Sequence, residues 1–426
     1  RSMVLEDDLD WSLFDDNLTH LINISQSQPK WLAKPVYGIA APVIILLTLV
    51  TNTLVILVLS HKNLRTPTNF ILLSMAITEL MTGLSTSPWF LYYYTFGGLE
   101  TDEREGLPEF WCTTHSYFAV HLPTIFHTAA IWLTVFLAVQ RYIYVCMPSL
   151  VIKYCNPRRT IHWILGICIS SVVAELPAMF SHMSFSVVGR SGRHYCLGRW
   201  VDSVDKVFGV DNYNAVALWT RAILVHILPC ILLIIFTTCL FRTINEADRK
   251  RSIHAMPVRR SYRHKPSNAQ ASANRLMHAT TRMLVVVIAI FLIIEIPIAL
   301  IFVFHFVVVY FQVFTVADYV AINNLLILRN FMIILTYPLN FAIYFGMSSS
   351  FKLQFRQMFS RKILYITSPS TENGWRPRFS VQLVDIHKIR APSHIFTRRN
   401  TTNTRKVNLH AITQSFVDES LTDDYL

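Results

Sequence analysis

The sequence is poor in charged residues, since Asp, Glu, Lys and Arg make up only 15% of it. A soluble globular chain carries about 25%, so the composition argues against a soluble protein. The predicted helices also lack any constellation of metal ligands or activated nucleophiles, which argues against an enzyme and predicts no cofactor. No inverted repeat and no pair of helices interrupted by Gly or Pro is visible, so a membrane transporter, the alternative from another class, has little support.

Long apolar runs occupy most of the chain. Runs long enough to cross a bilayer, about 20 residues each, recur seven times. They cover residues 36–60, 69–94, 116–146, 161–180, 213–241, 283–306 and 317–346. Seven such runs leave little room for a soluble fold, so we predict an all-α membrane protein with a seven-transmembrane helix bundle over residues 35–346.

The charges that are present lie on two sides of the predicted bundle. Basic residues concentrate in the first, third and fifth connections, and acidic residues in the first 16 residues and in the stretch 100–109. The positive-inside rule then predicts a multi-pass plasma-membrane protein whose amino-terminal segment, 1–34, is extracellular and whose carboxy terminus is cytosolic. The net charge of +12 belongs to a cytosolic surface facing the lipid bilayer, so we expect no nucleic-acid partner.

Two N-glycosylation triplets, Asn17-Leu-Thr and Asn23-Ile-Ser, lie in the segment predicted to be extracellular. We therefore predict glycans on Asn17 and Asn23. A third triplet at Asn400 lies on the cytosolic side by topology and is not a candidate.

One cation lies near the end of the third apolar run. Arg141 follows a stretch without acidic residues and precedes further apolar residues, so it either reaches lipid phosphates or has a function. Tyr142 follows it directly, and Pro148 stops the helix. This Arg-Tyr pair resembles the cytoplasmic end of the third helix in rhodopsin-like G-protein-coupled receptors. The preceding residue there is usually acidic, whereas Gln140 precedes the Arg here, so the usual ionic latch is absent.

Other helices carry further parts of this resemblance. Asn340 and Tyr344 fit the family's Asn-Pro-x-x-Tyr motif, although Phe341 occupies the Pro position. Glu295 replaces the Trp that usually lies two residues before the Pro of the sixth helix. The resemblance implies roles in activation and G-protein coupling for Arg141, Tyr142, Pro229, Phe291, Pro297, Asn340 and Tyr344.

Together, these departures from the usual rhodopsin-like motifs indicate one group within that class. The segments LAVQRYIYVC, LVHILPC, FLIIEIPIA and YPLNFAIYFGMS look like the invertebrate sex peptide receptor and myoinhibitory-peptide receptor family. The resemblance implies a receptor for short amidated neuropeptides, the best known carrying two spaced Trp residues, with coupling to inhibitory G proteins. The alternative ligand is an RFamide or myosuppressin-type peptide, because those receptors share the FHTxxIWLTV pattern found at residues 126–135.

The chain beyond the seventh run divides into two parts. The resemblance implies a short amphipathic helix eight over residues 347–361, with Phe351, Phe355 and Met358 on one face. The tail, 362–426, is rich in Ser, Thr, Pro and charge, and we expect it to be disordered. Its last hydroxyl residues, which lie among acids, are candidate targets for receptor kinases and arrestin.

Two polar residues lie at mid-membrane depth in the first two runs. Asn52 is expected to bond a neighbouring helix. Glu79 stands where the family normally has a sodium-binding Asp, and Ala130 stands where a Ser would often assist. We predict a polar core or ion site at Asn52 and Glu79, with weaker sodium binding than is usual in the family.

A disulfide is predicted between Cys112 and Cys196. A helix from Cys112 to Arg141 would extend roughly 43 Å at about 1.5 Å per residue, close to the bilayer thickness of about 40–45 Å with headgroups. Cys112 therefore lies outside when Arg141 lies inside, and Cys196 is the other cysteine predicted to be extracellular. The remaining five cysteines fall within or below the membrane and are expected to be free thiols.

The outer halves of the helices hold the candidates for ligand contact. Pro123 stands where amine receptors carry a ligand-binding Asp, which argues against a monoamine. An amidated peptide would stack its rings on aromatic side chains, and an acid would accept from its amide or from a basic residue. The candidates are Glu295, Glu175, Arg221, His127 and Trp89. The alternatives are interface anchoring for Trp89, core packing for His127, and snorkelling or pairing with an acid for Arg221.

Overall fold

The computed structural model describes residues 18–254, 268–311, 316–359, 362–367 and 380–385. Within this part of the chain, seven helical segments are long and apolar enough to cross a membrane. They are Lys30–Leu59, Pro67–Thr95, Glu109–Cys146, Pro157–Ser181, Val210–Glu246, Thr281–Ile301 and Asn323–Met347. The predicted all-α, seven-helix architecture is therefore confirmed.

Four of these seven segments contain a π-helical turn, in which the backbone accommodates one extra residue. The π turns are η2 (Val36–Ala40), η4 (Leu91–Thr95), η5 (Tyr117–His121) and η7 (Ala222–Ile227). Three of them join α3 (Lys30–Pro35) to α4 (Ala41–Leu59), α7 (Glu109–Ser116) to α8 (Leu122–Cys146), and α12 (Val210–Arg221) to α13 (Leu228–His254), while η4 extends α5 (Pro67–Phe90). The other spans are α10 (Pro157–Ser181), α14 (Asn268–Phe311) and α15 (Val316–Met347).

Local sequence signals set the starts of two spans. α5 begins at Pro67, after Thr66, whose hydroxyl accepts a hydrogen bond from a first-turn amide at 3.2 Å. α10 begins at Pro157, after Asn156, whose side chain accepts a similar bond at 3.1 Å. In both cases a capping side chain precedes a Pro at the first helical position, where a backbone N–H would have no helical partner.

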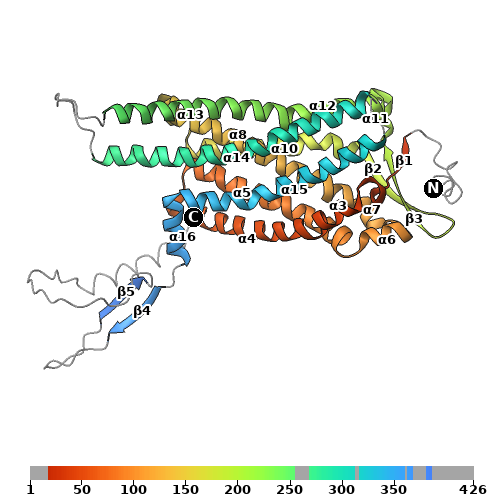
Figure 1. The fold of residues 1–426 in the computed structure, drawn as a ribbon, viewed down its shortest axis with the longest axis horizontal. Coiled ribbons are helices and arrows are strands. Elements are labelled where there is room, and N and C mark those ends of the chain that lie inside the picture. Colours follow the sequence, from red (N-terminus) through yellow and green to blue (C-terminus); the bar gives the residue numbers. More distant parts are fainter. Residues whose placement is uncertain (1–17, 255–267, 312–315, 360–361, 368–379, 386–426) are drawn as a thin grey trace, which may run out of the picture. The chain divides into compact units, whose positions relative to one another are not determined.

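Short elements cover one end of the bundle, which we call the hairpin end. β2 (His182–Val188) and β3 (His194–Trp200) form an antiparallel hairpin, and β1 (Thr19–Leu21) pairs with β3, which gives the order β1-β3-β2. α6 (Gly98–Glu105) and α11 (Asp202–Phe208) lie at the same end (Figure 1), and α2 (Ile24–Ser27) connects β1 to α3. The predicted disulfide between Cys112 and Cys196 is present, with Cα atoms 5.5 Å apart. It ties β3 covalently to the third span.

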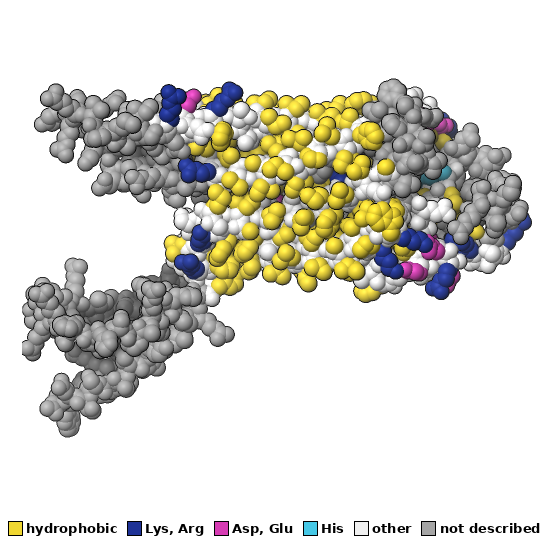
Figure 2. All heavy atoms as spheres, in the orientation of Figure 1, with side chains coloured by type: hydrophobic (Ala, Val, Ile, Leu, Met, Phe, Trp, Pro, Cys, Tyr) yellow, Lys and Arg dark blue, Asp and Glu magenta, His cyan; other side chains and the backbone are white. Residues whose placement is uncertain are grey.

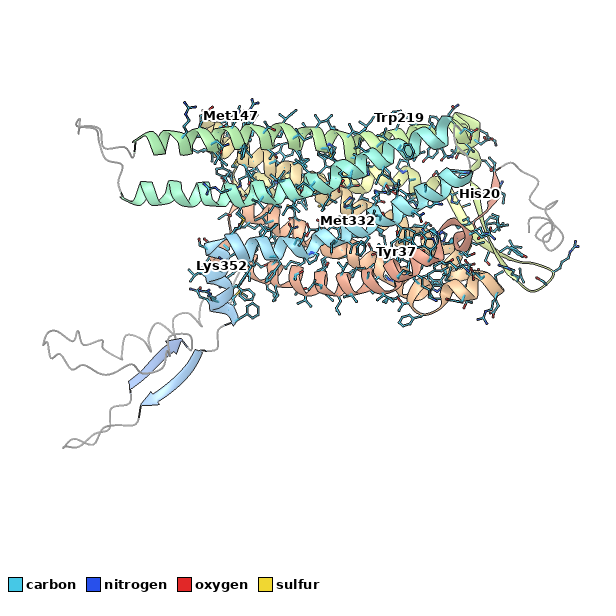
Figure 3. The ribbon with its side chains drawn as sticks, in the orientation of Figure 1. His20, Tyr37, Met147, Trp219, Met332 and Lys352 are labelled. Carbon is cyan, nitrogen blue, oxygen red and sulfur yellow. A yellow bond between two sulfur atoms is a disulfide. The ribbon has the colours of Figure 1, made fainter. Side chains whose placement is uncertain are left out.

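The opposite end, the α16 end, carries the amphipathic helix α16 (Ser349–Phe359) and three short connecting helices, η3 (Lys62–Leu64), η6 (Pro148–Leu150) and α9 (Val151–Tyr154). Met147 and Lys352 lie at this end, and His20 lies at the hairpin end (Figure 3). Apolar side chains cover the middle of the visible face, whereas Lys and Arg side chains lie toward both ends (Figure 2). This distribution is the one expected of a bundle that crosses a bilayer.

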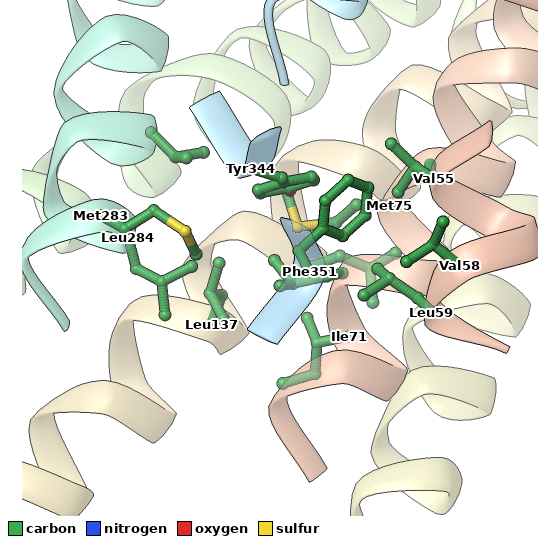
Figure 4. Close-up of a cluster of buried hydrophobic side chains, with 14 of the residues drawn as sticks. Val55, Val58, Leu59, Ile71, Met75, Leu137, Met283, Leu284, Tyr344 and Phe351 are labelled. Atoms are coloured by element: carbon green, nitrogen blue, oxygen red, sulfur yellow. The ribbon is translucent and has the colours of Figure 1, made fainter. Parts of the chain in front are cut away.

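The largest apolar core lies toward the α16 end (Figure 4). It joins α4, α5, α8, α10, α14, α15 and α16 through buried apolar side chains, two of which are aromatic. Among its members are Val55, Val58, Leu59, Ile71, Met75, Leu137, Leu284, Tyr344 and Phe351. α16 is thus anchored to the bundle by its apolar face, as amphipathicity predicts.

The residues from Phe359 onward form a separate unit. β4 (Lys362–Thr367) pairs antiparallel with β5 (Ser380–Asp385). Both strands fall within the stretch 362–426, for which disorder is predicted, and their β-branched residues favour extended pairing. The rest of the tail lies outside the described residues.

Candidate functional site

A cavity of about 320 Å³ lies at the hairpin end of the bundle. Its described lining comes from the segment before α3 and from the first, second, third, fifth and seventh spans. One wall is aromatic and contains Tyr37, Trp89, Phe90 and Tyr94. Four basic or imidazole side chains also line it: His127, Arg221, His226 and Arg329. Among the described residues, no Asp or Glu lines this cavity.

Arg221 is held at the cavity wall by Glu175 of α10. Its Nη2 donates to both carboxylate oxygens of Glu175, at 2.8 and 3.1 Å. His121 Nδ1 lies 3.0 Å from the same carboxylate. Pairing with Glu175 is thus the alternative for Arg221 that the structure shows. Glu175 itself is buried behind Arg221, and its oxygens already have partners.

Glu295 lies beneath the cavity rather than in its wall. One carboxylate oxygen lies 3.5 Å from His127 Nε2, and the other lies 3.5 Å from His226 Nδ1. Glu295 is only 2% exposed, and a buried acid needs donors or opposite charges around it. Both histidines line the cavity above. A ligand that moves either ring therefore changes the surroundings of Glu295.

Two residues of the seventh span complete the cavity and were not among the sequence-based candidates. Arg329 and Asn330 both line it, and Asn330 Nδ2 donates to the Tyr37 hydroxyl at 3.0 Å. A signal for Arg329 is present in the sequence, because it is the basic residue of the apolar run 317–346. An ionisable residue within a membrane span marks a functional site by default.

The aromatic wall is packed against its own neighbours. Trp89 stacks on Tyr93, with ring centroids 4.5 Å apart and 16° between planes. Tyr92 stacks on Trp111 at 4.2 Å. Trp89 is only 3% exposed, which does not fit the interface-anchoring alternative, since an anchoring Trp reaches the headgroups. A ligand ring must contact the edges of this aromatic cluster or displace one of its rings.

The amino-terminal segment closes part of the cavity. Gln28 lines the cavity and accepts a hydrogen bond from the Tyr94 hydroxyl at 2.8 Å. Nearby, the Thr95 hydroxyl donates to the Gly38 carbonyl at 2.8 Å. A Cβ at Gly38 would lie 2.8 Å from the Tyr94 carbonyl oxygen. The π turns of the first two spans therefore approach so closely that residue 38 must be Gly.

A polar core lies at mid-bundle, around Glu79. Asn52 Nδ2 donates to one of its oxygens at 3.3 Å, and Asn340 Nδ2 donates to the other at 2.6 Å. Glu79, Asn340 and Glu295 all line a small cavity of about 40 Å³. A cavity needs about 10–15 Å³ to hold a water molecule, so this one has room for water or a small cation. It connects the surroundings of the two buried acids.

Arg141 lies buried at the α16 end, 6% exposed. Its Nη2 donates to the Thr68 hydroxyl of α5, and that hydroxyl in turn donates to Gln140 Oε1 at 2.9 Å. The guanidinium also lies over the Tyr144 ring, 5.3 Å from its centroid. The ion pair with a preceding acidic residue is absent, as the sequence predicts. A hydroxyl on the neighbouring helix and an aromatic face contact the guanidinium instead.

The other predicted coupling residues lie near Arg141 or within the apolar cores. The Tyr142 ring lies 5.5 Å from a phenylalanine ring of α13. Tyr344 is 2% exposed within the largest core, and Phe291 contacts a second cluster formed by α8, α13 and α14. The predicted Pro229 and Pro297 lie within the fifth and sixth spans, and Pro338 lies within the seventh.

Of the two glycosylation candidates, Asn17 lies outside the described residues. Asn23 caps α2, and its Oδ1 accepts hydrogen bonds from the Ser25 hydroxyl at 3.1 Å and from the Gln26 amide at 3.2 Å. The Asn23 triplet therefore lies at the hairpin end, beside the cavity-closing segment.

Comparison with known proteins agrees with this arrangement. Residues 51–344 match the sequence profile of the 7 transmembrane receptor (rhodopsin family). The chain belongs to the rhodopsin family of receptors. The sex peptide receptor of Drosophila melanogaster is 33% identical to this receptor over 361 residues, covering 84% of the chain and 80% of the relative. Sex peptide receptor-related protein 2 of Caenorhabditis elegans is 33% identical over 337 residues, covering 76% and 71%.

This rhodopsin-family chain is a receptor and not an enzyme. Its similarity to the two sex peptide receptors extends over most of its length. By contrast, the deep-sea form of rhodopsin from Anguilla anguilla is 29% identical over 175 residues, only 38% of the receptor chain. The resemblance found in the sequence is therefore confirmed at the level of the receptor group.

Proposed function

We propose that this receptor binds an amidated neuropeptide of the myoinhibitory-peptide type in the hairpin-end cavity and signals through inhibitory G proteins. The observation that carries the proposal is the composition of the cavity, which combines an aromatic wall with basic and amide side chains. The similarity to two sex peptide receptors supports a peptide ligand.

The size of the cavity favours the end of a peptide. Ligand sites measure about 300–1,000 Å³, and this cavity of about 320 Å³ is near the lower limit. One or two terminal residues fill it, and the rest of the peptide lies against the hairpin and α6. Asn330 and Gln28 supply amide groups suited to a neutral terminal carboxamide, which needs both a donor and an acceptor.

The charges of the cavity favour the two-Trp peptides over the RFamide rival. An RFamide peptide brings an Arg next to its terminal ring, and that cation would face Arg221 and Arg329. The nearest acids are engaged, since Glu175 already binds Arg221 and Glu295 lies below between two imidazoles. Burying a cation without a counter-ion is costly. A neutral aromatic end avoids this cost.

The proposed orientation places the hairpin end outside the cell and the α16 end in the cytosol. A disulfide at the hairpin end suits an oxidising compartment. Glycans on Asn17 and Asn23 belong to the same proposal, tested by the shift in electrophoretic mobility after glycosidase treatment. The α16 end, with Arg141, is then the G-protein surface. Receptor kinases and arrestin are proposed to act on the tail, whose hydroxyl candidates lie outside the described residues.

The test is a side-by-side dose–response experiment in cells that carry an inhibitory-G-protein reporter. Amidated two-Trp peptides, their free-acid forms and RFamide peptides are applied to receptor of verified surface expression. We expect a nanomolar response, an affinity of about 12 kcal/mol, to the amidated two-Trp peptides. A response only to RFamide peptides would leave the receptor assignment unchanged but would replace the proposed ligand class. Silence to all peptides would contradict the proposal.

A cavity variant and a matched surface variant link the response to the site. Asn330→Ala removes an amide that lines the cavity and releases the Tyr37 hydroxyl, so we expect at least a tenfold loss of potency. Asn63→Ala changes the same residue type at an exposed position of η3 and should leave potency unchanged. Equal potency for both variants would move the ligand away from this cavity.

A further inference from the structure

Two imidazole rings meet on the strands that cover the hairpin end. His20 lies on β1 and His182 opens β2, and their ring centroids are 5.1 Å apart with 38° between planes. The two strands are not neighbours in the sheet, because β3 runs between them. The rings therefore reach toward each other across β3, above Gly198, which is the register partner of His20.

Gly198 makes room for this approach. A Cβ at that position would lie 2.4 Å from His182 Nε2 and 2.9 Å from His20 Nε2. Any side chain at position 198 would therefore collide with both rings. It follows that the two Nε2 atoms, the ring nitrogens farthest from the backbone, converge on one point of the sheet surface.

The chemical state of the rings suits metal ligation. Desolvation lowers the pKa of His20, although this residue is exposed, and burial together with the neighbouring histidines lowers the pKa of His182 to about 4. A lowered pKa favours the neutral imidazole, the form that binds a metal. The Trp200 ring, edge-on to His182 at 5.0 Å, fixes the orientation of that ring.

We propose that His20 and His182 form a binding site for a divalent transition-metal ion, with Zn²⁺ as the preferred occupant. Zn²⁺ binds imidazole nitrogen at about 2.0–2.1 Å, so small rotations of two converging rings suffice to hold it. No group of three metal-ligating side chains occurs among the described residues. Water therefore completes the coordination, and the ion is exchangeable rather than permanent.

The position of the site gives the ion a consequence. It joins β1 to β2 across β3 and so fastens the amino-terminal strand to the disulfide-linked hairpin. A short segment leads from β1 to Gln28, which lines the hairpin-end cavity and accepts a hydrogen bond from the Tyr94 hydroxyl. Zn²⁺ at the histidine pair therefore stabilises the segment that closes the cavity, independently of which peptide the receptor binds.

The experiment measures the thermal unfolding temperature of the purified full-length receptor during titration with ZnCl2, and with MgCl2 as the control ion. A ligand that binds only the folded state raises this temperature with concentration. We expect a Zn²⁺-dependent rise for the wild type and its loss in His20→Gln, His182→Gln and Gly198→Ala. The last variant keeps both imidazoles but fills the space between them.

His194→Gln is the matched control, because His194 lies on the same sheet but contacts Ser186 through Nδ1 at 3.4 Å. It should retain the full Zn²⁺ response. If the variants at positions 20 and 182 respond like the wild type, or if the wild type does not respond, the proposal is wrong. If a variant does not unfold cooperatively, carbethoxylation of histidines in the wild-type receptor is measured instead. Zn²⁺ must protect His20 and His182 from this modification. Modification of both rings in the presence of Zn²⁺ would contradict the site.

Discussion

Charge is buried at both ends of this receptor, but the partners differ. At the hairpin end, Arg221 is paired with Glu175, and Glu295 lies between two imidazoles beneath a cavity. At the α16 end, the structure records no ion pair for Arg141 within the described residues, and the guanidinium binds the Thr68 hydroxyl amid apolar packing. One end thus has charges that a ligand can rearrange, and the other has a cation held by a neutral group.

The region between the two ends contains residues that contact both. The small cavity of about 40 Å³ is lined by Glu295 from above and by Glu79 and Asn340 from below. Asn340 belongs to the seventh span, which also carries Arg329 in the hairpin-end cavity and Tyr344 in the apolar core. A displacement of α15 by a ligand would therefore alter both ends.

Truncating the apolar core should weaken the whole fold without changing ligand recognition. Leu137 is fully buried in the core of the α16 end, and Leu→Ala at such sites costs about 2–5 kcal/mol. We expect Leu137→Ala to lower the unfolding temperature of the purified receptor while peptide potency at matched expression persists. Ile169→Ala, at a side chain that is 62% exposed, is the control and should have little effect. A large loss of potency with unchanged stability would show that Leu137 contributes to ligand recognition rather than to the stability of the fold.

Neutralising the acid beneath the cavity should change signalling rather than folding. Glu295→Gln keeps the shape but removes the charge between His127 and His226. We expect a change of about tenfold in peptide potency or basal activity, which corresponds to about 1.4 kcal/mol, while surface expression persists. Glu109→Gln, at an exposed acid at the start of α7, is the matched control. Unchanged dose–response curves for Glu295→Gln would show that this acid has no role in ligand binding or signalling.

Removing the hydroxyl that holds Arg141 should raise basal activity. Thr68→Val preserves side-chain shape but eliminates the bonds to Arg141 and Gln140. A hydrogen bond to a charged group contributes about 1.5–3 kcal/mol, and only part of this favours the resting state, so we expect a several-fold rise in ligand-free signalling. Thr68→Ser retains the hydroxyl and should behave like the wild type. Equal basal activity in all three receptors would show that this bond does not restrain Arg141.

The smallest effect is expected from sodium. Both oxygens of Glu79 already accept hydrogen bonds from Asn52 and Asn340, and Ala130 supplies no hydroxyl to the small cavity beside them. We predict that sodium lowers agonist affinity by less than about tenfold and that Glu79→Gln abolishes this effect. Agonist binding is measured at matched ionic strength in sodium and in choline salts. No sodium effect in the wild type would rule out the ion site.

The sequence was sufficient to predict the features that depend on composition and topology. Apolar runs predict the seven spans, and the position of Cys112 relative to Arg141 predicts the disulfide with Cys196. These features follow from the bilayer thickness and from the oxidising side of the membrane, which act on any sequence in the same way.

Contacts between helices could not be predicted in the same way. Glu175 and Arg221 are candidates from the sequence, but only the rotation of α10 and α12 shows that they bind each other. The hydroxyl of Thr68 becomes a partner of Arg141 because α5 and α8 pack side by side. Arg329 does carry a signal in the sequence, because it is the basic residue of the apolar run 317–346. The π turns have no such signal in the sequence, and the close approach of Gly38 in η2 to Tyr94 in η4 is visible only in the structure.

The most direct measurement is the mapping of a bound peptide by photo-crosslinking. An amidated two-Trp peptide carrying a photoreactive group on its terminal Trp is bound to the purified receptor, irradiated, and located by mass spectrometry of receptor fragments. We predict attachment to residues lining the hairpin-end cavity, such as Trp89, Thr124 or Asn330. Attachment confined to the exposed face of the hairpin or to α11, and unaffected by Asn330→Ala, would contradict the assignment of this cavity as the ligand site.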